Sequence, residues 1–192
     1  MFNTKEEILA HVEYLKTAWP FEINEHLATF QRLAADCESV VEFGVGWGTS
    51  TWAFLSAEPK WVKSYDIIKY DELGLLFETV KRMGLNWELI LQNTADPALS
   101  IPECDLLFID SLHNADHVAA ELRHAHKVKK YIILHDVEKW GEVGESANEL
   151  GREDYNIKGI NYAINDFMAA HPEWREKERY TNNHGLLVLE RC

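Results

Sequence analysis

The stretch VVEFGVGWGTSTWAFL, residues 40–55, decides the fold of this chain. It places Gly44, Gly46 and Gly48 directly after a short apolar run and directly before a helical segment. Glycine readily takes positive φ angles and, because it has no side chain, lets a ligand approach the backbone. The stretch therefore predicts a buried strand, a cofactor-binding turn and a helix, in that order.

The same alternation continues after this turn. Short apolar runs alternate with amphipathic segments, which is typical of βαβ units whose parallel sheet is covered on both faces. The predicted fold is a doubly wound, Rossmann-like α/β domain with a mostly parallel seven-stranded sheet and an antiparallel C-terminal hairpin. The predicted strands are residues 40–43, 61–66, 87–91, 105–110, 131–135, 174–180 and 186–190, and the predicted helices are residues 49–56, 70–83, 115–127 and 160–170.

The chain shows no internal repeat and no stretch typical of an interdomain linker, so we expect a single domain over residues 1–192. Residues 1–36 form a helical preface in this interpretation, and residues 38–192 form the α/β core. Within the core, residues 139–159 are polar and contain several glycines. Compact domains rarely keep so long a loop without a function, so we predict a lid or binding loop there, with plain disorder as the alternative.

The preface is expected to contain two helices. Thr4 and Glu7 have the spacing of a capping box, which predicts the start of the first helix. The dipeptide Trp19-Pro20 then interrupts the helical pattern, and apolar residues at helical spacing mark a second helix after it. The preface is therefore predicted to pack against the core or to cap a site.

Composition and charge limit the classes of function. A chain of 192 residues with 46% hydrophobic and 27% charged positions has the composition of a globular protein. The net charge of −13 disfavours nucleic acid and anionic membranes as partners. The 3 cysteines are too scattered for a disulfide framework, and neither a membrane span nor a signal peptide is apparent. We therefore expect a cytoplasmic protein whose oligomeric state is open, a homodimer included.

The spacing of the glycines distinguishes between two cofactors. A dinucleotide fingerprint, G-x-G-x-x-G, needs a glycine at position 49, but this chain has Thr49 there and Gly48 before it. The pattern E-x-G-x-G-x-G that begins at Glu42 instead resembles motif I of class I S-adenosylmethionine-dependent methyltransferases. The resemblance implies S-adenosylmethionine as the cofactor, bound by Glu42, the three glycines and Thr49.

Two further acids are predicted to hold the adenosine part of the cofactor. Asp66 ends the second predicted strand, where a carboxylate can accept hydrogen bonds from both ribose hydroxyls. Asp96 follows the third predicted strand, at the place where such methyltransferases hold the adenine ring. The alternatives are a solvated or helix-capping aspartate at position 66 and an ordinary turn aspartate at position 96.

Polar side chains also follow the fourth and fifth predicted strands. Asp110 ends the fourth strand and is followed by His113, whereas His135 and Asp136 end the fifth. Because the carboxyl ends of parallel strands meet at one edge of a sheet, we expect these side chains to lie beside the glycine turn. Asp110 is then also a cofactor contact. Asp110 and Asp136 suit Mg²⁺ or another divalent cation, and His135 is a third candidate ligand if the strand ends between positions 135 and 136.

The alternatives for these residues are structural. Asp110 could be a helix cap or part of a salt bridge, His135 a buried core histidine and His113 an exposed loop residue. The remaining histidines of the following helix, His117, His124 and His126, are expected on its solvated face.

Residues 38–192 resemble metal-dependent O-methyltransferases, nearest the macrocin O-methyltransferase and cephalosporin-hydroxylase-like branch. The motifs that carry this resemblance are the glycine turn, the acid after the second strand, FIDSLH at 108–113, LHDV at 134–137 and NNHGL at 182–186. In that branch, the positions of Asp110 and of the pair at 135 and 136 hold Mg²⁺, and a histidine at position 113 is the general base. His135 departs from the acidic residue usual there, which leaves the ligand count and the metal open.

The sequence thus predicts metal-assisted methyl transfer to a hydroxyl of a small molecule of the diol, sugar or catechol type. In this mechanism Asp110 and His113 are catalytic, and an imidazole with an ordinary pKa near 6.5 can collect the released proton. An N-methyltransferase or nucleic-acid methyltransferase is an alternative, but enzymes acting on bases usually resemble D/N-P-P-Y/F after the fourth strand. A binding module for S-adenosylmethionine or a nucleotide, without transfer activity, is the non-enzyme alternative.

Overall fold

The central sheet has 7 strands in the order β3-β2-β1-β4-β5-β9-β8. The first five are parallel, whereas β9 runs antiparallel to both β5 and β8. This computed structural model describes residues 1–18, 23–146 and 153–192. The strands of the sheet are β1 (Ser39–Phe43), β2 (Trp61–Asp66), β3 (Trp87–Leu91), β4 (Cys104–Ile109), β5 (Val128–His135), β8 (Trp174–Tyr180) and β9 (Leu186–Arg191).

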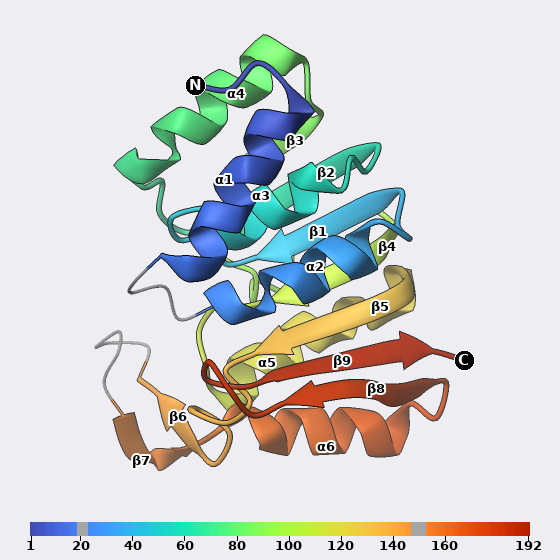
Figure 1. Ribbon diagram of the computed structural model, residues 1–192. Helices are drawn as coiled ribbons and strands as arrows, with labels where there is room; N and C mark the ends of the chain where they lie inside the picture. The colour runs from blue at the N-terminus through green and yellow to red at the C-terminus, as the bar shows by residue number, and fades with distance from the viewer. Residues whose placement is uncertain (19–22, 147–152) are drawn as a thin grey trace.

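Helices cover both faces of this sheet (Figure 1). They are α1 (Lys5–Thr17), α2 (Leu27–Ala34), α3 (Thr49–Ser56), α4 (Gly74–Met83), α5 (Ala115–Leu122) and α6 (Ile160–Ala170), with 3-10 turns η1 (Asn24–His26), η2 (Asp71–Leu73) and η3 (Arg123–Lys127). The predicted mostly parallel sheet with its antiparallel C-terminal hairpin is confirmed. In the described ranges, no helix is both long enough and apolar enough to cross a bilayer.

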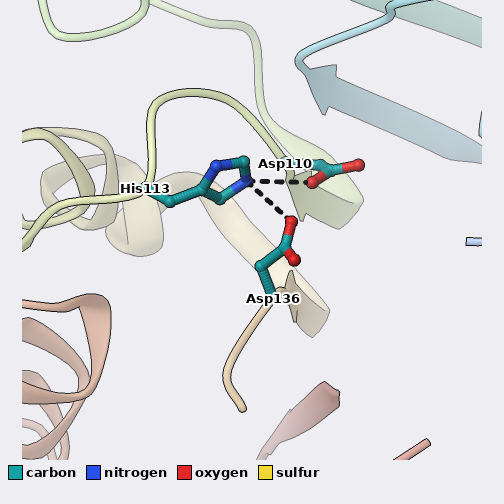
Figure 2. A group of neighbouring side chains, drawn as sticks. All are labelled: Asp110, His113 and Asp136. Atoms are coloured by element: carbon teal, nitrogen blue, oxygen red, sulfur yellow. Dashed lines mark hydrogen bonds and ion pairs between the residues drawn. The ribbon is translucent and has the colours of Figure 1, made fainter. Parts of the chain in front are cut away.

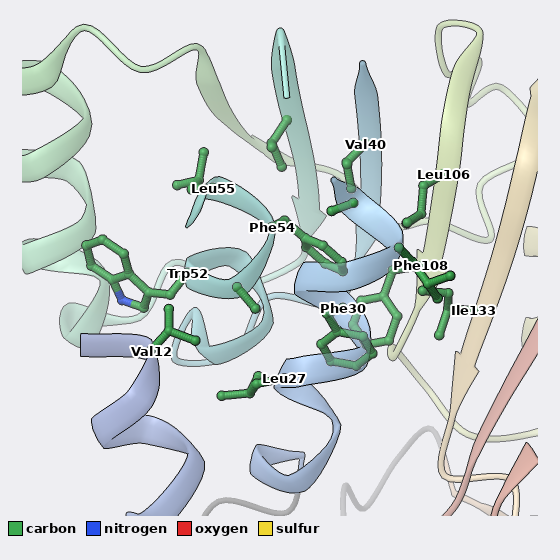
Figure 3. Close-up of a cluster of buried hydrophobic side chains, with 14 of the residues drawn as sticks. Val12, Leu27, Phe30, Val40, Trp52, Phe54, Leu55, Leu106, Phe108 and Ile133 are labelled. Carbon is green, nitrogen blue, oxygen red and sulfur yellow. The ribbon is translucent and has the colours of Figure 1, made fainter. Parts of the chain in front are cut away.

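Burial on both faces explains the apolar runs of the strands. Successive residues of a strand point to opposite faces, so Val40 packs in the cluster beneath α1, α2 and α3 while Val41 packs against α5 and α6. Figure 3 shows the first cluster, in which Phe30 of α2 and Phe54 of α3 meet Phe108 of β4. The helical preface therefore completes one half of the core.

The elements differ from the predicted ones mainly at their ends. The predicted helix over residues 70–83 is η2 followed by α4, and the one over residues 115–127 is α5 followed by η3. The capping box of Thr4 and Glu7 is confirmed at the start of α1. The break at Trp19-Pro20 lies outside the described residues.

The predicted loop at residues 139–159 is not without secondary structure. It contains β6 (Val143–Glu145) and β7 (Glu153–Lys158), which form a separate antiparallel sheet. Residues 147–152 of this segment lie outside the described part. A lid function for the segment stays a prediction, but its first strand is fastened to the site described below.

The strand order places β1 and β4 side by side at the centre, with β2 and β3 on one side and β5 on the other. In an open α/β sheet, ligands bind outside the carboxyl ends of the strands at the point where the strand order reverses. That point here is the end of β1 and β4. The glycine turn follows β1, and Asp110 follows β4.

Candidate active site

The three glycines of the turn have different surroundings. A Cβ atom at Gly44 would lie 1.9 Å from the backbone oxygen of Asp110, so this glycine is required by the packing of β1 against β4. Gly46 has a φ of +51°, and a Cβ atom there would meet nothing within 4 Å. Gly48 packs against the side chain of Leu73 instead. Gly46 is therefore the position where the backbone is open to a ligand.

Asp66 holds the turn in place. Its Oδ2 accepts hydrogen bonds from the backbone nitrogens of Val45 at 2.8 Å and Gly46 at 3.2 Å. Its Oδ1 accepts from the backbone nitrogen of Ile68 at 3.0 Å. The carboxylate also faces the cavity beside the turn, so its predicted contact with a ribose stays compatible with its structural contacts.

Glu42 does not face this cavity, and its predicted contact with the cofactor is corrected. The side chain is fully buried beneath the turn, where its carboxylate accepts hydrogen bonds from the hydroxyls of Ser50, Thr51 and Ser64. Burial raises the pKa of Glu42 to about 7, although the three hydroxyl hydrogen bonds act in the opposite direction. The residue therefore joins β1, α3 and β2 under the turn.

Two adjoining cavities form a crevice over the carboxyl ends of the strands. The first has a volume of about 400 Å³ and is lined by residues that include Asp66, Thr94, Ser111 and His117. The second has a volume of about 510 Å³ and reaches Thr49, His113, His135 and Asp136. Gly44, Gly46, Tyr70 and Asp110 line both cavities. A ligand that lies along the glycine turn therefore connects the two.

The first cavity differs from the prediction in two residues. Asp96 is not among its lining residues, because its Oδ1 accepts from the backbone nitrogen of Ala98 at 2.8 Å in a tight turn. This hydrogen bond is the one that the turn alternative for Asp96 expects. His117 was expected in solvent, yet it is half-buried and faces the cavity, with its Nε2 3.1 Å from Oγ1 of Thr94.

The two other histidines of this region lie on η3. His124 is buried, and burial, followed by the charge of Arg123, lowers its pKa to about 4, so the solvated position expected for it is wrong. His126 is exposed, as expected.

The second cavity ends at a cluster of carboxylates and imidazoles (Figure 2). Nε2 of His113 lies 3.2 Å from Oδ1 of Asp110 and 3.0 Å from Oδ2 of Asp136. One potential ligand atom from each of these three residues lies within 4.8 Å of the other two. The structure thus brings together residues that the sequence predicted at the ends of separate strands.

His135 joins the same cluster from β5. Its Nδ1 lies 3.2 Å from Oδ1 of Asp110 and 3.1 Å from Oδ2 of Asp136, and its Nε2 lies 3.0 Å from the backbone oxygen of Asn183. Adjacent strand residues would point to opposite faces, but β5 ends at His135 and Asp136 has a φ of +62°. This left-handed residue, rare outside glycine, lets both side chains reach one site.

The carboxylates strongly affect the proton affinity of both imidazoles. Burial lowers the pKa of His113, but its contacts with Asp110, Asp136 and Glu145 outweigh burial and hold that pKa well above the usual value. The pKa of His135 rises to about 10 because two carboxylates likewise outweigh burial. Despite their burial, Asp110 and Asp136 have lowered pKa values because of the same pairs. The raised pKa favours the protonated form of the His113 imidazole, whereas the predicted general base needs the neutral form.

Three further residues join the cluster, and of these only Glu145 had no signal in the sequence. Glu145 of β6 places its Oε2 2.9 Å from Nδ1 of His113. His184 places its Nδ1 3.2 Å from Oδ1 of Asp136, and the backbone oxygen of Asn183 contacts His135. Asn183 and His184 belong to the turn between β8 and β9 and both have positive φ values. The NNHG motif gave the only signal for this turn.

No family model matches the sequence, and no curated protein is significantly similar to it. Solved structures do share its fold. The O-methyltransferase from Bacillus cereus in complex with SAH has a TM-score of 0.63 and 15% identity, over 100% of this chain and 92% of that chain. The chain has the Rossmann-like methyltransferase fold.

Other solved structures with this fold are named as methyltransferases that act on different acceptors. The 1,6-didemethyltoxoflavin-N1-methyltransferase from Burkholderia thailandensis has a TM-score of 0.64 and 14% identity, over 98% of this chain and 87% of that chain. An rRNA methylase from Streptococcus thermophilus has a TM-score of 0.57 and 15% identity, over 92% of this chain and 99% of that chain. The methyltransferase fold by itself therefore does not choose the acceptor atom.

Proposed function

We propose that this chain is an S-adenosylmethionine-dependent methyltransferase that methylates a hydroxyl of a small molecule with the help of a divalent cation. The observation that carries the proposal is the crevice itself. Its two cavities share Gly46, where the backbone is open, and Asp110, which belongs to the carboxylate and imidazole cluster. A cofactor that lies along the glycine turn would present its reactive end to that cluster.

The size and polarity of the crevice suit the two parts of such a cofactor. Cavities of about 300–1,000 Å³ are usual for small-molecule sites, and each of the two cavities falls within this range. The cavity beside Asp66 offers a carboxylate for ribose hydroxyls and the Thr94–His117 pair for the base. The other cavity leads to the carboxylates and receives the acceptor in this proposal.

The reaction is an in-line displacement at the methyl carbon. A lone pair of the acceptor oxygen forms the new C–O bond while the S–C bond breaks and its electron pair returns to sulfur. The protein chiefly has to align these atoms and to help the hydroxyl lose its proton. A divalent cation held by Asp110 and Asp136 would, when bound, lower the pKa of the acceptor hydroxyl.

The groups at the end of the crevice support a diol, sugar or catechol as the acceptor in this proposal. A divalent cation held by Asp110 and Asp136 would attract two neighbouring oxygens, as a diol, sugar or catechol would offer. The released proton has to pass to a group with a lone pair, which can be the neutral imidazole of His113 or a water molecule. The net charge of −13 disfavours an RNA acceptor.

A thermal-shift panel tests the cofactor. S-adenosylhomocysteine, NAD and ATP are each added to the full chain, with and without Mg²⁺. A ligand at about 100 times its Kd adds about 2.7 kcal/mol of stability, which for a chain of this size raises Tm by about 5–10 °C. We expect this shift with S-adenosylhomocysteine. A shift with NAD alone would contradict the proposal.

Transfer of a labelled methyl group to a panel of diols, sugars and catechols tests the reaction. We expect transfer that is lost in Asp110→Ala and in the presence of a chelator, while S-adenosylhomocysteine still binds. Asp116→Ala is the matched control, because Asp116 is an exposed acid at the start of α5 and does not line the crevice. Intact cofactor binding without transfer to any acceptor would instead identify a binding module.

A further inference from the structure

Both imidazoles of the cluster are oriented by an acceptor on the nitrogen that faces away from Asp110 and Asp136. Nδ1 of His113 contacts Oε2 of Glu145 at 2.9 Å, and Nε2 of His135 contacts the backbone oxygen of Asn183 at 3.0 Å. A carbonyl or carboxylate oxygen can only accept, so each of these nitrogens carries a hydrogen. In the neutral imidazoles, the lone pairs therefore belong to Nε2 of His113 and Nδ1 of His135.

These two nitrogens face the same pair of carboxylate oxygens. The four nitrogen–oxygen distances to Asp110 Oδ1 and Asp136 Oδ2 are 3.2 and 3.0 Å for His113 and 3.2 and 3.1 Å for His135. Neighbouring ligand atoms around an ion with bonds of about 2.1 Å lie about 3.0–3.4 Å apart, in octahedral and tetrahedral arrangements respectively. The four nitrogen–oxygen separations are therefore in the range of neighbouring donors around one small ion, and Asp110, His113 and Asp136 each bring a ligand atom within 4.8 Å of the other two.

The type of donor distinguishes between metals. Mg²⁺ prefers oxygen ligands, keeps several waters and usually takes one or two protein carboxylates. Imidazole nitrogen suits zinc, iron, cobalt or nickel, especially where an outer acceptor fixes its tautomer. Two oriented imidazoles beside two carboxylates are therefore a poor match for Mg²⁺ and a good match for a first-row transition metal.

We propose that the cluster is a binding site for a divalent first-row transition metal in preference to Mg²⁺, with Asp110, His113, His135 and Asp136 as the ligands. This inference deepens the proposed function, because the ion would lie at the acceptor end of the crevice. It also replaces the predicted Mg²⁺ and reassigns His113 from general base to metal ligand. Figure 2 shows Nε2 of His113 directed at both carboxylates.

Glu145 is a positioning residue in this proposal. The backbone nitrogen of Glu145 donates to the backbone oxygen of His113 at 2.9 Å. Nδ2 of Asn114 donates to the backbone oxygen of Glu145 at 3.3 Å. These bonds fasten β6 to the loop that carries His113, so the carboxylate of Glu145 is held against Nδ1. The segment predicted as a lid thus contributes the group that turns His113 toward the ion.

Titration of the full chain with metal ions, after a chelator has removed any bound ion, tests which metal the cluster prefers. Calorimetric titration with CoCl₂, ZnCl₂ and MgCl₂ is combined with the visible absorption spectrum of bound Co²⁺. We expect Co²⁺ and Zn²⁺ to bind one ion per chain at least 100-fold more tightly than Mg²⁺. Equal affinities, or no binding of any of the three ions, would overturn the proposal and leave a metal-free network of ion pairs.

Variants show whether the two imidazoles are ligands. His113→Asn and His135→Asn should each weaken Co²⁺ binding at least tenfold and change its visible spectrum, whereas His126→Asn, at an exposed position of η3, should change neither. His113→Gln is the second variant at that position in case the first does not fold. Unchanged Co²⁺ affinity and spectrum in folded variants at both positions would contradict the assignment.

Two further measurements test whether Glu145 positions His113 or only stabilises the fold, and whether the metal proposal can fail independently of the proposed function. Glu145→Ala should weaken Co²⁺ binding by about 10–100-fold. Glu145→Gln should recover most of it, because the amide oxygen can still accept from Nδ1 of His113. S-adenosylhomocysteine affinity is measured on the same samples. If the unmodified chain does not bind S-adenosylhomocysteine, the proposed function is contradicted. If it binds S-adenosylhomocysteine but does not prefer Co²⁺ over Mg²⁺, only the metal proposal is overturned.

Discussion

Gly44 and Asp110 are in direct contact through their backbones, because a Cβ atom on the glycine would lie 1.9 Å from the backbone oxygen of the aspartate. This contact joins the end of β1 to the residue that follows β4. It therefore joins the turn proposed to hold the cofactor to the cluster proposed to receive the acceptor. Two glycines of the same turn can be compared on this basis.

We expect Gly44→Ala to lower the free energy of unfolding by roughly 2–4 kcal/mol, since it adds a clash with backbone to a residue at positive φ. Gly46→Ala should cost only about 1–2 kcal/mol, because its φ is also positive but the space around it is open. Urea unfolding of both variants measures the difference. Equal losses would show that the backbone contact does not constrain position 44.

Asp66→Ala should affect both the turn and the cofactor. The variant loses the acceptor for the backbone nitrogens of Val45 and Gly46, so its free energy of unfolding should fall by about 1–3 kcal/mol. Its affinity for S-adenosylhomocysteine should fall by at least about 1 kcal/mol. Calorimetry at a temperature where the variant is folded separates the two effects. Unchanged affinity would reject the ribose role of Asp66.

Glu42 should make stability depend on pH. Its pKa is about 7 in the folded chain and near 4.5 when exposed, so between these values the folded state keeps a proton that the unfolded state releases. The free energy of unfolding therefore falls as pH rises through this window, by roughly 3 kcal/mol from this residue. Glu42→Gln should flatten the stability profile between pH 4.5 and 7. Parallel profiles for the two proteins would contradict the shifted pKa.

His117 offers a test of the first cavity. Its side chain lines the proposed adenosine site and contacts Thr94, so His117→Ala should weaken binding of S-adenosylhomocysteine by about 1 kcal/mol, or roughly fivefold. His126→Ala is the matched control, because that side chain is exposed on η3. An equal affinity for the two variants would place the adenine elsewhere.

Much of the fold follows from local patterns in the sequence. The strands at the centre are buried on both faces and therefore appear as continuous apolar runs, which is why β1 and β4 could be placed to within one residue. The convergence of Asp110, His113 and Asp136 follows from a rule about parallel sheets, whose carboxyl ends share one edge. Neither inference needs knowledge of packing.

The residues that were misplaced depend on packing that no local pattern records. Glu42 is turned inward by hydroxyls from α3 and β2, and its position in the motif does not reveal those partners. Glu145 reaches His113 from β6, which pairs with β7 outside the central sheet, and no local pattern indicates this pairing. His117 and Thr94 line the first cavity and Asp96 does not, because the turn after β3 directs Thr94 toward the cavity and engages Asp96 within the turn.

Calorimetric titration of the full chain with S-adenosylhomocysteine, repeated with Gly46→Ala, tests the central claim most directly. We expect one molecule bound per chain in the unmodified protein and an affinity at least tenfold weaker in the folded variant, whose new methyl group would occupy the open side of the turn. No binding to the unmodified chain, or the same affinity in both proteins, would contradict it.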